Sequence, residues 1–169
     1  MIFLTVGNWH KGFDRLVEAV DKLKEQNVIT DTVTAQIGSG NYKPANLRSF
    51  DYCSPNEFSD IISKSRVIIT HAGIGTIGQA IKLIKPVIVV PRKAELGECS
   101  NNHQFTTAKE LAKEGKILVA YEVFELPHKL EEAANFVPAD EQGGQEIIRT
   151  VEIFLEQLAA KKYKSDNND

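Results

Sequence analysis

Residues 66–84 read RVIITHAGIGTIGQAIKLI. The stretch begins with an apolar run, Val67-Ile68-Ile69, whose β-branched side chains are typical of a buried strand. A glycine-rich segment follows, and from residue 75 the apolar side chains recur at the spacing of one helix face. The stretch therefore predicts a strand, a short loop and a helix, which is the repeating unit of α/β proteins.

The same alternation extends over most of the chain. We expect strands at residues 2–6, 32–37, 47–52, 66–70, 86–90 and 116–120. We expect helices at residues 13–24, 54–64, 75–84, 102–114, 123–135 and 144–161. Apolar strands separated by helices predict a parallel sheet covered on both faces, because right-handed crossovers carry the helices over the sheet. The predicted fold class is α/β, with a single Rossmann-like, doubly wound parallel sheet.

Length and composition are those of an ordinary globular protein. The chain has 169 residues, of which 42% are hydrophobic and 25% charged, and one domain usually takes about 100–200 residues. We therefore expect a single domain at residues 1–161 and a polar tail at residues 162–169. The net charge of −3 disfavours a nucleic-acid partner, which usually requires a basic surface.

Cysteine content and hydropathy bear on location. Cys53 and Cys99 do not make a disulfide framework, so reduced thiols in a cytosolic protein are expected. No run reaches the ~18 apolar residues of a membrane-spanning helix, and the N-terminus lacks the charged start of a secretory signal. The expected location is cytoplasmic, with membrane contact made only through a surface or a partner.

The loops after the strands are the places to look for a ligand, because ligands of open parallel sheets bind beyond the carboxyl ends of the strands. The first such loop runs from Gly7 to Gly12, and its two glycines allow close approach of the backbone to a ligand. The helix that follows offers free N–H groups to an anion. A simple turn remains an equal alternative for this loop.

A second loop precedes the helix at 75–84 and contains His71, Gly73 and Gly75. Thr76 and Gln79 share one face of that helix, where a hydroxyl could meet a phosphate and an amide could meet a ribose. A capping or core histidine is the alternative for His71.

A third loop begins with Arg92 and Lys93 and ends at His103 and Gln104, which open another helix. These side chains could meet a phosphate together with the helix N–H groups. Solvated surface charge is the alternative for the two cations.

Several other kinds of site are absent from the sequence. The cysteines and histidines lack metal-ligand spacing, so no metal is expected. Neither a G-x-S-x-G hydrolase elbow nor a dinucleotide fingerprint is present.

The three loops together resemble the donor-binding half of GT-B glycosyltransferases, a glycosyltransferase family 28 C-terminal-domain-like sequence. The resemblance rests on residues 70–76, 85–92 and 102–104, with support from residues 3–7 and 13–17. Among such enzymes the sequence is most similar to the small, split members. These are the catalytic subunit of the eukaryotic dolichol-linked N-acetylglucosaminyltransferase and bacterial exopolysaccharide or capsule subunits.

The resemblance implies a UDP-sugar donor and assigns donor-binding positions. These are Gly7, Asn8, His71, Gly73, Gly75, Thr76, Gln79, Arg92, His103 and Gln104. Gln79 stands where relatives place an acidic residue against the ribose, so the hydrogen bond to the diol loses its charge assistance.

The resemblance also implies inverting transfer of the sugar to a lipid-linked acceptor, without a divalent metal or another cofactor. Helix N-termini and Arg92 or Lys93 would stabilise the leaving diphosphate. His10 is the one weak candidate for the catalytic base, because its loop faces the expected cleft. The resemblance therefore implies a second, membrane-anchored, acceptor-binding subunit. The helix at 144–161 is a candidate docking element, and packing on its own sheet is an equal alternative for it.

Three alternatives remain open. The chain could be a non-catalytic UDP-sugar-binding subunit that regulates another glycosyltransferase. A nucleotide-sugar epimerase of the same fold normally needs two domains in one chain. A stand-alone α/β interaction domain would bind no uridine nucleotide.

Overall fold

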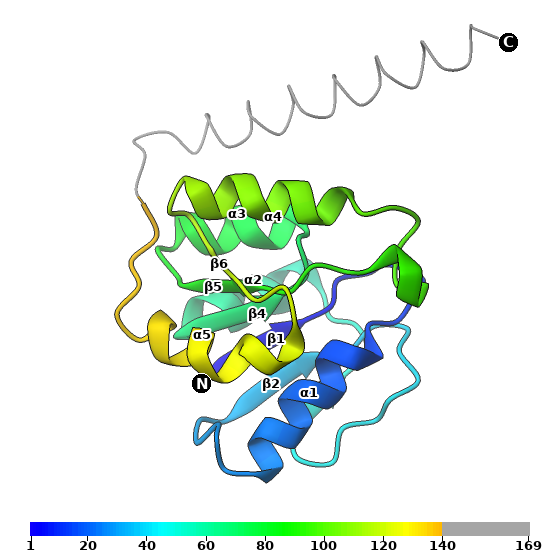
Figure 1. The fold of residues 1–169 in the computed structure, drawn as a ribbon. Coiled ribbons are helices and arrows are strands. Elements are labelled where there is room, and N and C mark those ends of the chain that lie inside the picture. The colour runs from blue at the N-terminus through cyan, green and yellow to red at the C-terminus, as the bar shows by residue number, and fades with distance from the viewer. Residues whose placement is uncertain (140–169) are drawn as a thin grey trace, which may run out of the picture.

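The computed structural model describes residues 1–139, which form a parallel six-stranded sheet with helices on both faces (Figure 1). The strands are β1 (Ile2–Thr5), β2 (Val33–Gln36), β3 (Arg48–Phe50), β4 (Val67–Thr70), β5 (Val87–Val89) and β6 (Leu118–Val119). The helices are α1 (Asp14–Glu25), α2 (Pro55–Lys64), α3 (Ile74–Lys82), α4 (His103–Lys113) and α5 (Leu126–Ala133), with 3-10 turns η1 (Ala94–Leu96) and η2 (Val123–Glu125). The predicted fold class is confirmed.

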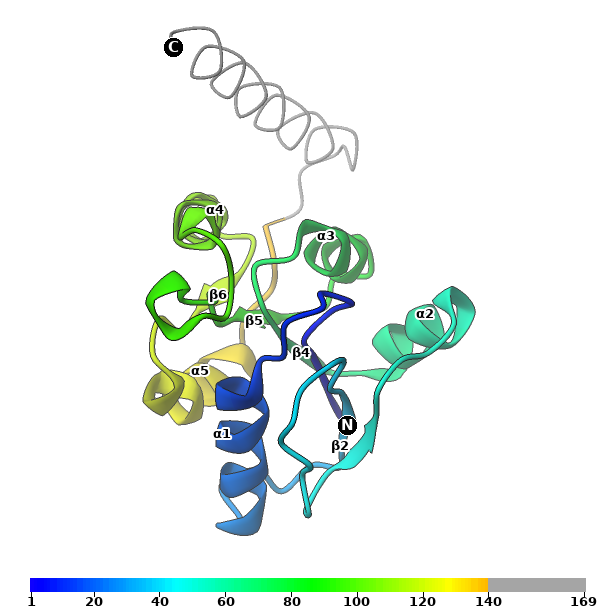
Figure 2. The same cartoon turned by 90° about the vertical axis from the view of Figure 1, so that its right-hand side faces the viewer.

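Two apolar layers enclose the sheet. Ile2 and Leu4 pack in the layer under α1 and α5, whereas Phe3, which lies between them in β1, packs in the layer with Ile77 of α3. Successive side chains of a strand point to opposite faces, so a strand buried on both faces must be apolar without interruption. Figures 1 and 2 show α3 and α4 on one side of the sheet and α1 and α5 on the other.

All strands are parallel, in the order β3-β2-β1-β4-β5-β6. Successive strands are added on one side of β1 up to β3 and on its other side from β4 onward. From β1 the chain crosses to β2 through α1, and from β4 it crosses to β5 through α3 on the opposite face. The loops after β1 and β4 therefore separate at the carboxyl edge, which is where an open α/β sheet forms a ligand-binding crevice.

Local sequence signals account for several element boundaries. Ser54 and Glu57 form a reciprocal capping box, and Pro55 occupies the first turn of α2, as the sequence predicts. The helix expected at 123–135 is instead a 3-10 turn followed by α5. Pro127 lies in the first turn of α5, because a proline cannot donate to the preceding turn of a continuous helix.

The predicted end of the domain at residue 161, the helix at 144–161 and the tail at 162–169 lie outside the described residues. In the described part of the chain, no helix is long and apolar enough to cross a membrane.

Candidate functional site

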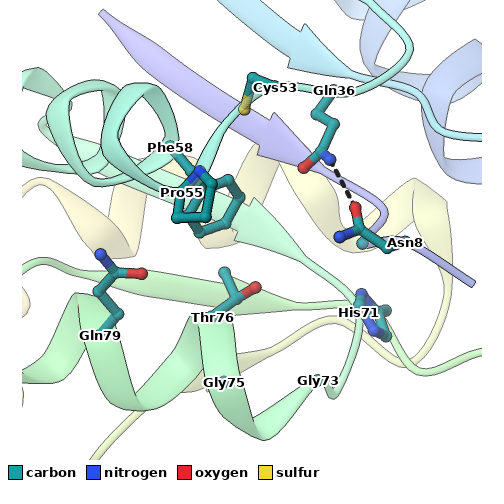
Figure 3. Close-up of a pocket in the computed structure, with 11 residues that line it drawn as sticks. Asn8, Gln36, Cys53, Pro55, Phe58, His71, Gly73, Gly75, Thr76 and Gln79 are labelled. Atoms are coloured by element: carbon teal, nitrogen blue, oxygen red, sulfur yellow. Dashed lines mark hydrogen bonds between the residues drawn. The ribbon is translucent and has the colours of Figure 1, made fainter.

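The main pocket lies at the carboxyl ends of β1 and β4 and has a volume of about 510 Å³ (Figure 3). Seven of the predicted donor-site residues line it: Gly7, Asn8, His71, Gly73, Gly75, Thr76 and Gln79. The side chains of Thr76 and Gln79 stand out from α3 toward Pro55 and Phe58 of α2. The pocket has the size of a small-molecule site.

A second pocket of about 310 Å³ adjoins the first and shares His71 and Gly73 with it. Its other lining residues are Trp9, Arg92, Cys99, Ser100, Asn101, His103 and Gln104. The fold therefore brings all the predicted donor-site positions to the lining of two adjoining cavities. His10 lines neither of them; its ring is exposed and lies tilted against the Trp9 ring, with 4.7 Å between ring centroids.

His71 lies where the two pockets meet, between two glycines. A Cβ atom added at Gly7 would lie 2.7 Å from His71 Cε1, and one added at Gly73 would lie 2.5 Å from Nε2. Gly7 also has a φ of 73°, in the left-handed region that favours glycine. These two glycines are needed for the close approach of the imidazole to the backbone.

The imidazole of His71 is neutral at physiological pH. Burial, with a smaller effect of the Arg92 guanidinium, lowers the pKa of His71 to about 4. The hydroxyl of Thr70 donates to the Thr5 carbonyl oxygen at 2.9 Å and lies 3.5 Å from His71 Nδ1. Because that hydroxyl proton is already used, the proton of the imidazole is assigned to Nδ1 and Nε2 is left as an acceptor.

The N-terminus of α3 supplies the backbone donors of the main pocket. Gly73 precedes its first turn and no side chain caps it, and that turn contains no acidic residue. The first N–H groups of a helix have no partner within the helix, and the helix dipole is positive there. At the start of α4 the N-cap Asn102 makes no capping hydrogen bond and the first turn has no acidic residue, but the His103 backbone N–H donates to Asn101 Oδ1 at 3.2 Å.

Arg92 does not take the position expected for a phosphate ligand. The residue is 1% exposed, and its Nη atoms donate to the carbonyl oxygens of Val6, Lys11, Gly12 and Glu98 at 2.8–3.1 Å. Its guanidinium also lies 4.7 Å from the Phe13 ring centroid. Arg92 therefore holds the loop between β1 and α1 in place, and its charge faces the interior of the protein.

Other polar side chains of the third loop also have interaction partners within the protein. Lys93 forms an ion pair with Glu122. The side-chain oxygen of Gln104 accepts a hydrogen bond from the Arg92 backbone N–H at 3.0 Å. His103 is exposed, and its Nδ1 contacts the side-chain oxygen of Asn101.

The prediction from sequence missed four residues of the main pocket. Pro55 and Phe58 lie in α2, after β3, and Cys53 lies in the loop before them. Burial raises the pKa of the Cys53 thiol, with a smaller contribution from Glu57. Gln36, which ends β2, is 2% exposed. The signal for Gln36 was available, because a polar residue in an apolar strand needs a hydrogen-bonding partner when it is buried.

The lining residues suit a polyanion that carries hydroxyl groups. The two pockets offer helix N–H groups, a hydroxyl, amides and a neutral imidazole, and none of their lining residues is Asp or Glu. Among the described residues, no cluster of three His, Cys, Asp or Glu side chains could hold a metal ion. Such a lining offers fixed dipoles and hydrogen-bond donors to an anionic ligand.

Comparisons with known proteins agree with the geometry. The model of the glycosyltransferase family 28 C-terminal domain matches residues 1–165. The chain is 31% identical over 125 residues to the human UDP-N-acetylglucosamine transferase subunit ALG13, an alignment that covers 69% of this chain and 10% of the human protein. It is 33% identical over 101 residues to the protein of the same name from Debaryomyces hansenii, covering 56% of this chain and 46% of that protein.

A similar fold is known from a solution NMR structure of ALG13. That structure superposes with a TM-score of 0.62 at 19% identity, and the match covers 88% of this chain and 93% of the solved chain. The chain spans only about a tenth of the human relative's length.

Proposed function

The chain belongs to the glycosyltransferase family 28 C-terminal-domain family, and on that basis we propose that it is the donor-binding, catalytic component of a two-chain glycosyltransferase. In this proposal it takes a sugar from a UDP-sugar and passes it to a lipid-linked saccharide held by a second, membrane-anchored chain. UDP-N-acetylglucosamine is the first donor to test, because the similar human protein is named as a transferase subunit for that nucleotide sugar.

The observation that most supports the proposal is the pocket between β1, β4 and the start of α3. The uncapped first turn of α3 and the hydroxyl of Thr76 would hold the diphosphate, and Gln79, one turn further along the same helix, would reach the ribose. The adjoining pocket at His103 and Gln104 would take the sugar. Dipoles fixed in this way stabilise the charge that develops on the leaving diphosphate as the glycosidic bond breaks.

Activation of the acceptor hydroxyl needs a base from outside the two pockets. Neither pocket contains a carboxylate, and the low pKa of His71 makes its imidazole a poor proton acceptor at neutral pH. His10 lies on the same loop as Trp9 but outside both pockets, so it stays a candidate together with groups of the second chain. The lack of a carboxylate base in the two pockets also favours the alternative function, a UDP-sugar-binding subunit that regulates another transferase.

Trp9 provides the binding assay, because it is the protein's only tryptophan and lines the second pocket. We expect its fluorescence to saturate with UDP and with UDP-N-acetylglucosamine but not with ADP or NAD. Thr76→Val should weaken UDP binding about tenfold or more, as expected for a lost hydrogen bond to a charged group. Thr106→Val is the matched control, because Thr106 is exposed on α4 and lines neither pocket.

Equal responses to uridine and adenine nucleotides would contradict the donor-site proposal. A transfer assay then separates the two candidate functions. Labelled sugar should enter the lipid fraction of membranes that carry the second chain, and Thr76→Val should slow that transfer. A chain that binds UDP-sugar but leaves transfer unchanged when the pocket is mutated would be the regulatory subunit.

A further inference from the structure

A chain of hydrogen bonds connects the buried end of the first strand to Asn8 at the edge of the main pocket. The Gly7 N–H group donates to Thr5 Oγ1 at 3.3 Å, and that hydroxyl donates to Gln36 Oε1 at 2.7 Å. Gln36 Nε2 then donates to Asn8 Oδ1 at 2.8 Å (Figure 3). Thr5 is 0% exposed and Gln36 is 2% exposed, so water does not compete for the contact between them, whereas Asn8 is exposed at the pocket edge.

The direction of the chain is set by the groups at its buried end. The hydroxyl of Thr5 accepts from a backbone N–H group, and Gln36 Oε1 is the acceptor for its single proton. With the Gln36 amide reversed, the Thr5 hydroxyl would face an NH₂ group and its proton would lose that acceptor. A buried donor without an acceptor is destabilising, so the Gln36 oxygen faces Thr5 and its NH₂ group faces Asn8.

This polarity orients Asn8. Its oxygen is held by Gln36, so its NH₂ group lies on the other side, toward the space between Pro55 and Thr76 (Figure 3). An NH₂ group donates hydrogen bonds and suits an anion, whereas the amide oxygen would repel one. Without Gln36, an exposed asparagine amide could turn either end to the ligand.

We propose that Gln36 is a positioning residue that makes Asn8 a hydrogen-bond donor to the diphosphate. The proposal rests on the proposed function of the main pocket as a donor site. It predicts that Gln36 contributes to the binding of the charged part of the nucleotide and not to the binding of the nucleoside.

Gln36→Glu replaces the amide with a carboxylate of similar size, which when ionised can still accept from Thr5 but can no longer donate to Asn8. Asn8 then turns its NH₂ group toward residue 36 and its oxygen toward the pocket. We expect UDP to bind about tenfold or more weakly, as for a lost charge-assisted hydrogen bond, while uridine binding changes less than about twofold. Gln36→Met, which is neutral and makes neither hydrogen bond, should weaken UDP binding in the same direction.

A double-mutant cycle separates positioning from added charge. With Asn8→Ala as the background, Gln36→Met should have no further effect on the affinity for UDP. Thermal melting of each variant shows that it is folded, and two-dimensional ¹⁵N–¹H NMR titration measures binding of UDP and of uridine in the full chain. Additive losses from the two substitutions, or equal losses for UDP and uridine, would overturn the role of Gln36.

The hydrogen bond itself is tested without a nucleotide. The side-chain NH₂ resonances of Gln36, identified by their disappearance in Gln36→Met, should shift in Asn8→Ala because one proton loses its acceptor. An unchanged Gln36 resonance refutes the proposal even if the wild-type chain binds no UDP. Failure of the wild-type chain to bind UDP, with the shift observed, would instead refute the donor site and the diphosphate role that depends on it.

Discussion

Replacing Gly73 by alanine tests whether the backbone must approach His71 closely. The new Cβ would lie 2.5 Å from Nε2 and 2.7 Å from Cε1 of the imidazole. Gly73 has a φ of −86° and a ψ of 111°, which alanine adopts freely, so the cost comes from the collision and not from the backbone. The ring cannot move toward Gly7, because a Cβ added at Gly7 would also lie 2.7 Å from Cε1, so it is displaced toward the pockets that it lines.

The expected loss can be estimated from overpacking. Inserting a methyl group into a well-packed position costs about 1–3 kcal/mol, which corresponds to a decrease in Tm of roughly 3–10 °C for a protein of this size. The displaced ring moves into one of the two pockets that it separates, so UDP affinity should fall as well. Differential scanning calorimetry measures the first effect and Trp9 fluorescence the second.

Gly78→Ala is the matched control. A Cβ at Gly78 would meet nothing within 4 Å, and the residue lies inside α3 and lines neither pocket. This substitution should stabilise the protein by about 0.5–1 kcal/mol, since alanine favours the helix more than glycine does. In a His71→Ala background the cost of Gly73→Ala should largely disappear. A Gly73→Ala protein as stable as the wild type, or an unchanged cost after removal of the ring, would refute the steric explanation.

Three further predictions concern stability. Arg92→Met removes the buried donors to the carbonyl oxygens of the β1–α1 loop. The free energy of unfolding, measured by urea denaturation, should fall by about 2–5 kcal/mol. A decrease below ~1 kcal/mol would show that the loop conformation does not depend on Arg92. The Arg66 guanidinium beside Asp31, helped by the N-terminal amine, lowers the pKa of Asp31 from 3.8 to about 2, so its contribution is present above pH 3.8 and is lost as the pH falls toward 2. Asp31→Asn should therefore make the free energy of unfolding depend less on pH between about pH 4 and pH 2. A pH dependence as steep as that of the wild type in this range would contradict a stabilising role for the Asp31 carboxylate. Ser54→Ala removes the capping box of α2 and should lower the free energy of unfolding by about 1 kcal/mol, whereas an unchanged urea midpoint would show that the cap adds nothing.

Local sequence patterns are enough to predict most of the elements and three of the loops that line the pockets. Strand positions follow from uninterrupted apolar runs, because a strand covered on both faces has no polar side. The start of α2 follows from Ser54 and Glu57, whose reciprocal contacts span only three residues. The candidate loops follow from their place after strands, since parallel strands end at a common edge.

Which side chains of those loops face the pockets depends on contacts between distant parts of the chain. Arg92 directly follows a strand, as a phosphate-binding arginine would. Its guanidinium nevertheless donates to the carbonyl oxygens of Lys11 and Gly12, which lie about 80 residues earlier in the chain. Gln36 meets Asn8 across 28 residues, and His71 meets Gly7 across adjacent strands. Periodicity and capping are local interactions that a short stretch of sequence reveals. The direction of a buried polar side chain depends on which distant carbonyl or amide the fold brings within hydrogen-bonding distance, and that is fixed only when the strands pair.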